Sequence, residues 1–432
     1  MKIYLFFISS FLSLTAIQAQ NLDLATCFKM ADTANITLRN SRLDIEINQK
    51  QKKAYLASRY PKITATGDYK YNAIIPGQVV PGAFFGGAPG TYTTVQFGVP
   101  YNLSNTVQLT QILYNPLLNY GLSALDINQK IVEIQNQLTT QEVRQQVAST
   151  FFNLQAVGRQ ILFVEGNIKN MDKLIANLEK TYEQGLVIGT DVDKLKISRL
   201  TLLNSQQSLS ATKFQLESLL RILIGLKNDA PVSLLSDEMI EKSILIDKTT
   251  ISRPELLLIQ SQQEMNLEER KGTNMSYLPN LSFYGSYNYT YNMKPADDFR
   301  KGINSAFIGL RLDWTLFDGF EKYNKQKMNL MNKDKLNNQL DLTTQQLSLQ
   351  TENAKNQIEI QTSSLNIAKE QLVLATRVYD QSTAQYNLGT ISANELIQAD
   401  NGLQQAQTNV VAAYIQLRQA ELTFLRSIGN IK

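Results

Sequence analysis

Four segments of the chain alternate apolar and polar residues with a period of two, which is the pattern of β-strands with one apolar face. These segments cover residues 63–71, 93–112, 281–292 and 304–316. In the first of them the odd positions are Ile63, Ala65, Gly67, Tyr69 and Tyr71, and Thr, Asp or Lys fills each even position. Each segment is therefore predicted to be a strand of about ten residues, with an aromatic-rich apolar face and a polar face.

Such strands fit two environments. A membrane-facing sheet places tyrosine rings at the membrane–water interface, where one end of the ring is dry and the other is wet. A half-buried sheet of a soluble domain shows the same alternation, but no helix that adjoins these strands has an apolar stripe suited to cover them. Four strands cannot close a membrane barrel, which needs about eight or more. A membrane sheet of this size must therefore be shared between copies of the chain, and three copies would supply about twelve strands.

Apolar residues recur three and four positions apart over most of the remaining chain, which predicts long helices. We expect helices over residues 22–60 and 119–182, and again from residue 253 to 275. Two further segments carry apolar residues seven positions apart. These are Leu195, Leu202, Leu209, Leu216 and Leu223, and then Leu396, Leu403, Val410, Leu417 and Phe424. These apolar residues at heptad spacing predict that each segment packs as a helix against the helix before it. The result is two helical hairpins with tips at residues 185–189 and 389–393, where glycine allows the left-handed backbone that ends a helix.

The two hairpins are related by an internal repeat. Tyr182–Gly225 returns as Tyr386–Gly429, an offset of 204 positions without a gap, and both copies begin with Tyr-x-x-Gly and end with Ile-Gly. Such self-similarity predicts a duplicated architecture. The expected parts are a first repeat over residues 20–225, a lateral linker, or equatorial region, over 226–252, and a second repeat over 253–432.

The residues at heptad spacing do not occupy equivalent positions in the two repeats. Under the same offset, Leu202, Leu209 and Leu216 coincide with Ala406, Ala413 and Ala420. We take this as a hypothesis of large-to-small complementarity between the repeats.

The composition argues against catalysis. The chain has 432 residues, no histidine and a single cysteine, Cys27. It therefore lacks the most common general base and the most common metal ligand, and it cannot form an intramolecular disulfide. No cluster of carboxylates or nucleophiles stands out, so we expect no enzyme activity, no cofactor and no metal site. A formal net charge of +4 without a basic run also argues against a nucleic-acid binder.

The N-terminus indicates export. Residues 1–19 combine a basic start at Lys2, an apolar segment and a small residue at Ala19, which is typical of a signal peptide. The mature chain is expected to begin near Gln20. An N-terminal membrane anchor is the alternative, but the apolar segment is short for one. Cys27 follows Leu-Ala-Thr as in a lipoprotein acylation site, but it lies well past the apolar segment, so we interpret it as a helix-packing residue.

The chain resembles the TolC-type outer membrane factors, the exit ducts of tripartite efflux and type I secretion systems. The resemblance covers nearly all of the mature chain and includes the duplicated halves, the strands that follow a proline and the two tip motifs, Tyr182–Asp191 and Tyr386–Thr390. It implies a mainly helical homotrimer with a twelve-stranded β-barrel in the cell outer membrane and an α-barrel in the periplasm.

The resemblance also implies partners. A periplasmic adaptor protein would dock on the tips, and an inner-membrane transporter of the resistance-nodulation-division or ABC type would supply the cargo. The adaptor-contacting positions correspond to Gly185, Leu186, Val187, Leu388, Gly389 and Thr390. The sequence leaves the cargo open between drugs, metal ions and proteins.

The same resemblance places a periplasmic aperture at Thr190, Asp191, Tyr386, Ile391, Glu395 and Gln398. The best-known family member has an arginine where this chain has Ile391, which leaves a Tyr386–Asp191 hydrogen bond and apolar contacts to close the aperture. Three copies of Glu395 around one axis would form a negative constriction that favours cations. The alternative for Asp191 and Glu395 is an ordinary role at a helix start, where the helix dipole favours acids.

Three other classes of protein explain the sequence less completely. An exported coiled-coil structural or adhesive protein without channel activity explains the heptads but not four amphipathic strands. A periplasmic adaptor has one hairpin between β-rich domains, whereas this chain has two hairpins. A hydrolase needs a convergent site that the sequence does not show.

Overall fold

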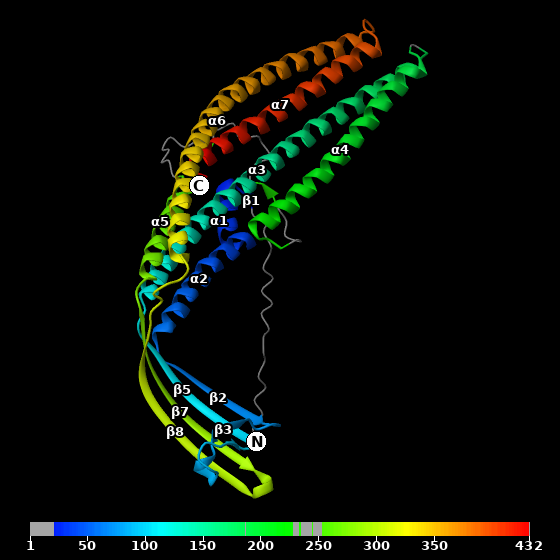
Figure 1. Ribbon diagram of the computed structural model, residues 1–432. Coiled ribbons are helices and arrows are strands. Elements are labelled where there is room, and N and C mark those ends of the chain that lie inside the picture. The colour runs from blue at the N-terminus through cyan, green and yellow to red at the C-terminus, as the bar shows by residue number, and fades with distance from the viewer. Residues whose placement is uncertain (1–20, 186, 228–232, 235–243, 245–252, 432) are drawn as a thin grey trace, which may run out of the picture. The chain divides into compact units, whose positions relative to one another are not determined.

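The computed structural model describes most of the chain (Figure 1). The described residues are 21–185, 187–227, 233–234, 244 and 253–431. The predicted signal peptide, residues 1–19, and most of the predicted linker, residues 226–252, lie outside them. Two compact units share these residues. The first comprises residues up to Asp44, Glu133–Leu258 and Leu340–Lys432, and the second comprises Ile45–Val132 and Ile259–Gln339.

The second unit contains an antiparallel sheet of four strands in the order β2-β5-β7-β8. The strands are β2 (Lys62–Tyr71), β5 (Tyr101–Tyr114), β7 (Asn280–Lys294) and β8 (Phe299–Asp313). The predicted fold class required four such strands, and all four are present. Within the described part of the chain, β2 and β8 each pair with only one strand of this sheet, so the sheet has two open edges.

The register of the sheet keeps apolar residues on one face. Ile63 pairs with Leu109, Val107 with Tyr287, and Gly285 with Ile308. Because side chains alternate across a strand, the odd-numbered residues of β2, β5 and β7 and the even-numbered residues of β8 share this face. The opposite face is polar and hydrogen-bonded between strands. Asn102 Nδ2 donates to Asn292 Oδ1 at 2.6 Å, and Asn288 Nδ2 donates to the hydroxyls of Ser104 at 3.1 Å and Thr106 at 2.7 Å.

The Gly/Pro-rich segment between β2 and β5 is folded rather than an open loop. It forms β3 (Gly77–Pro81), the short helix η2 (Gly82–Phe85) and β4 (Tyr92–Gln96), and β3 pairs with β4 in its own antiparallel hairpin. The predictions of a loop over residues 72–92 and of one strand over 93–112 were therefore wrong. Gly98 has a φ of +151°, and Pro100 has no N–H for a sheet hydrogen bond, so the chain leaves one sheet before it enters the next.

The first unit contains two helical hairpins (Figure 1). The first joins α3 (Pro116–Glu183) to α4 (Gly189–Ile224), and the second joins α6 (Glu321–Asn387) to α7 (Ala393–Ser427). The predicted repeat has a structural counterpart in their backbone. Gly185 and Gly389 at the tips have φ values of +73° and +72°, and Gly225 and Gly429 at the ends have +73° and +70°. Equivalent glycines thus end equivalent helices in the left-handed conformation.

The predicted single helix over residues 22–60 is divided. The structure has α1 (Leu24–Ala34), α2 (Ile36–Leu56) and the short helix η1 (Ala57–Arg59). The break is at Asn35, which has extended backbone. The Asn35 side chain accepts from Leu38 N–H at 3.2 Å and donates to the Leu223 carbonyl at 2.8 Å, so it caps α2 and ties it to the end of α4.

The remaining elements are α5 (Pro254–Met275), the short helix η3 (Pro295–Asp297) between β7 and β8, and a parallel pair formed by β1 (Asn21–Leu22) and β6 (Ser233–Leu234). The helices α2, α3, α5 and α6 each begin in one unit and end in the other. In the described ranges, no helix combines the length and the hydropathy that a membrane-spanning helix needs.

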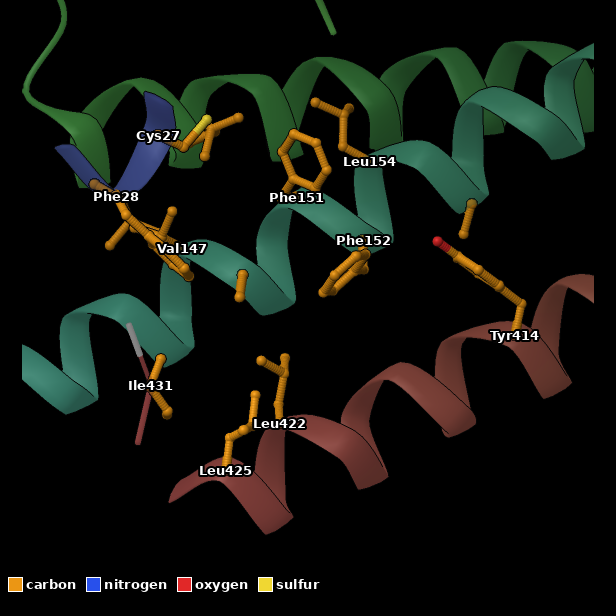
Figure 2. Close-up of a cluster of buried hydrophobic side chains, with 14 of the residues drawn as sticks. Cys27, Phe28, Val147, Phe151, Phe152, Leu154, Tyr414, Leu422, Leu425 and Ile431 are labelled. Atoms are coloured by element: carbon orange, nitrogen blue, oxygen red, sulfur yellow. The ribbon is translucent and has the colours of Figure 1, made fainter. Parts of the chain in front are cut away.

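The main apolar core of the first unit lies where α1, α3, α4 and α7 meet (Figure 2). Phe151 and Phe152 of α3 pack edge to face with ring centroids 5.8 Å apart, and Leu422 and Leu425 of α7 complete the cluster. Cys27 of α1 belongs to the same core and is fully buried. Burial raises the pKa of the Cys27 thiol to about 12. Cys27 is thus an unreactive packing residue in this fold.

Candidate functional site

The tip of the second hairpin is a tight turn held by its own backbone. Leu388 lies on its surface and is 78% exposed. Gly389 follows in the left-handed conformation, and Thr390 turns back onto α6, where its N–H and its hydroxyl donate to the Gln385 carbonyl at 3.0 and 2.9 Å. This closure satisfies carbonyl groups that the end of a helix leaves free. The tip is a rigid turn that presents an apolar side chain to solvent.

Glu395 caps the helix that follows this tip. Its carboxylate accepts from Ser392 N–H at 2.7 Å, while the Ser392 hydroxyl accepts from Glu395 N–H at 3.3 Å. This reciprocal capping box fixes the start of α7. The alternative role predicted for Glu395, a helix-start acid, is therefore realised in the chain, and its side chain remains exposed.

The first hairpin has a different tip. Gly185 is left-handed as expected, but Ile188 stands at the N-cap of α4 and offers no side-chain hydrogen bond. Asp191 instead pairs with Lys194, with Oδ1 and Nζ 3.3 Å apart. Sequence reasoning missed Lys194, although its spacing of three residues from Asp191 on a helix is a signal for such a pair. The equivalent acids of the two repeats, Asp191 and Glu395, thus have different partners.

Tyr386 lies beside this tip but does not form the predicted bond. Its hydroxyl is buried and finds no hydrogen-bonding partner among the described residues. Burial raises the pKa of Tyr386, and the negative charge of Asp191 raises it further. The expected hydrogen bond between Tyr386 and Asp191 is therefore absent within one chain, and the Asp191 carboxylate is paired with Lys194. Tyr386 packs instead against an apolar cluster.

This tip cluster joins all four long helices. Its buried members are Met171, Leu174, Ile175, Leu178, Val192, Leu195, Leu202, Tyr379, Leu396 and Leu403. Val187 and Tyr386 pack against it from the two tips. Farther from the tips, Asn167 of α3 and Gln407 of α7 exchange amide hydrogen bonds of 2.8 and 3.3 Å. The two hairpins are thus one packed body near their tips, with α3 and α7 in contact.

The other predicted site residues lie around this body. Thr190, Thr390 and Gln398 are exposed, Ile391 and Val187 are half-buried, and Gly389 and Gly185 are on the surface. Leu186 lies outside the described residues. The structure therefore brings the predicted aperture residues to one end of the helical unit, and most of the polar ones face solvent.

Asp400 is a site residue that sequence reasoning missed. It is 3% exposed, although it lies between Leu396 and Leu403 of the apolar seam. Gln404 Nε2 donates to Asp400 Oδ2 at 2.6 Å. Burial raises the pKa of Asp400, and burial together with the Asp400 charge raises the pKa of Tyr379 on α6. The missed signal was the alternation of four and three residues along α7, which places Asp400 in the same buried stripe.

Two comparisons show what the chain is similar to. Residues 245–430 match the family model for outer membrane efflux proteins. The matched residues lie almost entirely within the second repeat. The resemblance inferred from the tip motifs is thereby confirmed. No curated protein is similar enough in sequence to count as a match.

Solved structures extend the similarity to nearly the whole chain. The channel-forming protein CusC aligns with a TM-score of 0.73 and 14% identity over 95% of this chain and 93% of its own. The outer-membrane channel OprN gives a TM-score of 0.73 and 14% identity over 94% and 90%. The outer membrane channel CmeC of Campylobacter jejuni gives 0.72 and 13% over 94% and 85%. The predicted fold class, with duplicated helical hairpins and a sheet, is confirmed.

Proposed function

We propose that this protein is an outer membrane channel, the exit duct of a tripartite efflux or type I secretion system. The observation that carries the proposal is the sheet of the second unit. One of its faces is apolar and rich in tyrosine, the other is a hydrogen-bonded polar layer, and both edge strands are open. Membrane strands need this division between a lipid face and a water face, and they tolerate no unpaired edge in lipid.

Three copies of the chain would satisfy these edges. The β8 edge of one copy would pair with the β2 edge of the next, and three sets of four strands would close a barrel of about twelve. The helical unit supports the same assembly. α4 and α6 expose apolar side chains that no described residue covers, among them Ile197, Phe214, Ile360 and Val373. In a ring, α4 of one copy would lie against α6 of its neighbour.

The polar layer would line the path of the cargo. Its strand-to-strand contacts are made by amides and hydroxyls, such as Asn102 with Asn292 and Asn288 with Thr106. Neutral groups of this kind hydrogen-bond to water, and the charged residues of the same face include both signs, with Lys70 and Asp68 paired at 2.8 Å. Such a lining suits a duct that passes different cargoes, whose selection then belongs to the inner-membrane transporter.

The helical tips would form the periplasmic mouth. Leu388 and Ile188 are exposed there and are suited to dock an adaptor protein. A cysteine introduced by Leu388→Cys should cross-link to the adaptor in cells, because the only native cysteine, Cys27, is buried. Ser208→Cys on the exposed face of α4 provides the matched control. Equal cross-linking at both positions would argue against docking at the tips.

The aperture would be lined by Glu395 from each copy. Glu395→Gln removes the charge but keeps a residue that can complete the capping box, whereas Glu395→Ala removes both. If the charge rings the pore, both variants should lose block by multivalent cations to the same extent. If Glu395 only caps α7, Glu395→Gln should behave as the parent channel does.

Reconstitution tests the channel itself. The purified protein should come from the outer-membrane fraction as a heat-sensitive oligomer of three chains and should conduct ions across a planar bilayer. A protein that fractionates as a soluble monomer and gives no conductance would contradict the proposal. The same preparation would exclude the exported structural or adhesive protein if it conducts.

A further inference from the structure

The hairpin between β2 and β5 is unusual in its composition. Residues 72–100 contain no Asp, Glu, Lys or Arg, although charged residues make up 19% of the whole chain. The segment is nevertheless ordered into β3, η2 and β4, and the N–H of Gly82 donates to the Thr91 carbonyl at 2.7 Å to close the hairpin. It is thus a defined structure without charge, which we call the apolar hairpin.

The apolar hairpin exposes its large side chains instead of burying them. Phe84 is 81% exposed and Ile74 is 86% exposed. The other exposed large apolar residues of the segment are Val79, Phe85, Tyr92 and Phe97. A chain in water gains free energy by covering such groups, at roughly 25 cal/mol for each Å² of apolar surface. Their dense exposure on an ordered backbone indicates that something outside the chain covers them.

The second turn at this end of the sheet has the opposite character. Tyr101 pairs with both Tyr71 and Met293, so the apolar hairpin and the β7–β8 turn leave the sheet at the same level. The β7–β8 turn carries ion pairs, in which Lys294 contacts Asp297 and Arg300 lies 3.9 Å from Asp298. Charged groups of this kind remain in water. Two turns at one level thus have different surroundings.

The strands that carry the apolar hairpin end in an aromatic band. The rings of Tyr71 and Tyr101 lie 4.9 Å apart, and those of Tyr69 and Tyr101 lie 6.3 Å apart, all on the apolar face of the sheet. Tyrosines at this position are typical of a membrane–water interface. The apolar hairpin begins directly after Tyr71 and ends directly before Tyr101, so it continues from the interface level.

From this continuity we propose that the apolar hairpin rests in the lipid bilayer interface, with Phe84 and Phe85 among the acyl chains. This inference rests on the proposed membrane position of the sheet. The other face of the same strands, with Lys70 and Asn102, is polar and hydrated, so an apolar segment without charge is poorly matched to the lumen. The hairpin is then a lateral anchor of the channel in the membrane.

The single tryptophan of the chain allows a direct test. Trp314→Phe removes it, and a new tryptophan is then placed by Phe84→Trp in the apolar hairpin, Phe299→Trp beside the charged turn or Tyr287→Trp on the apolar face. Each full-length channel is reconstituted in phosphatidylcholine vesicles whose acyl chains carry bromine, and its fluorescence is compared with that in unbrominated vesicles. Aqueous iodide probes exposure to water.

Bromine should quench the Phe84→Trp fluorescence to an extent comparable with Tyr287→Trp, and iodide should quench only Phe299→Trp. The proposal is overturned if iodide quenches Phe84→Trp as strongly as Phe299→Trp, which means a hairpin in water. It is also overturned if neither agent quenches Phe84→Trp, which means a hairpin packed between copies of the chain. Failure of bromine to quench Tyr287→Trp would refute the membrane position of the sheet, and so separates the two proposals.

Discussion

Phe214 of α4 and Arg418 of α7 occupy equivalent positions of the two repeats, yet their polarity and burial are reversed. Phe214 is 65% exposed, whereas Arg418 is 1% exposed. The Arg418 guanidinium lies over the rings of Tyr414 and Phe152, at 5.1 and 5.7 Å from their centroids, and pairs with Glu421 at 2.5 Å. The buried charge is thus paired within the chain, and no described residue covers the exposed ring.

The reversal follows from the order of the helices (Figure 1). α3 and α7 lie side by side at the centre of the helical unit, and α4 and α6 lie on its two sides. The apolar side chains of α7 are therefore covered by its own chain, and no large apolar residue is exposed anywhere along α7, which is described throughout. α4 keeps an exposed apolar side, which a neighbouring copy would cover in the proposed ring. One repeated sequence thus forms a covered helix in one repeat and a helix with an open apolar side in the other.

The largest expected effect comes from removing the buried carboxylate of Glu421. Glu421→Ala removes the carboxylate that pairs with the buried Arg418 and should lower the free energy of unfolding by about 3–5 kcal/mol. The equivalent residue of α4 is Glu217, whose carboxylate lies 3.5 Å from Arg221. Glu217→Ala should cost less, about 1–2 kcal/mol, because this contact is longer and the Glu217 side chain is 19% exposed. Guanidinium unfolding of the detergent-solubilised protein, followed by helical circular dichroism, measures both, and equal losses would refute the contrast.

A second test adds volume at the small positions of α7. Ala413 is buried in the core, and its equivalent, Leu209, is half-buried on α4. Ala413→Leu should overpack the core, cost about 1–3 kcal/mol and impair assembly of the oligomer. Leu209→Ala makes the reverse exchange, from large to small, at the equivalent position of α4. An Ala413→Leu variant that assembles and melts like the parent protein would end the hypothesis of large-to-small complementarity.

Asp400 provides a pH-dependent test. Because burial raises its pKa, the folded state binds a proton more tightly than the unfolded state. The stabilisation by this proton is complete below the unfolded pKa and is lost as the pH rises through the folded pKa. Asp400→Asn should therefore stabilise the protein at neutral pH, by on the order of 1 kcal/mol, and should flatten the change in stability between acid and neutral pH.

The equivalent of Asp400 on α4 is Lys196, which forms a surface ion pair with Glu179 at 2.8 Å. Lys196→Gln should leave the acid-to-neutral profile unchanged, so it controls for the loss of a charge. Melting temperatures across this pH range decide the question. An Asp400→Asn variant with the same profile as the parent protein would show that Asp400 is solvated in the assembled channel.

The smallest effects concern the helix caps. Ser392 caps α7, whereas Ile188 holds the equivalent place on α4 without a capping side chain. Ser392→Ala should cost about 1 kcal/mol locally, and Ile188→Ser should gain a similar amount. Amide hydrogen exchange at the first turns of α4 and α7 reports each change. Exchange that is unaltered in both variants would mean that packing, and not capping, holds the tips.

Much of this architecture was predictable because it depends on local chemistry. The period of two in residues 63–71 fixed both the strand and its apolar face, since side chains alternate across any strand. Gly185 and Gly389 marked the tips, because few other residues adopt the left-handed backbone that ends a helix. The capping role of Glu395 also followed from its place near a helix start. Each of these features involves residues close together in the chain.

Other features escaped prediction because they depend on distant partners. The break at Asn35 is stabilised by the Leu223 carbonyl, far away in the sequence, and the apolar hairpin forms because two short segments with modest alternation pair with each other. The place of Tyr386 also depends on distant residues, since it packs against a cluster formed by all four long helices.

The sequence by itself determined most of the elements, their duplication and the side of each sheet strand that is apolar, because periodicity and glycine conformations act over a few residues. Only the tertiary structure decided that α7 is an inner helix and α4 an outer one. Their seams look alike in sequence, and burial depends on which neighbours lie beside a helix. The same fold therefore buries Arg418 and Asp400 in one repeat and exposes Phe214 and Lys196 in the other.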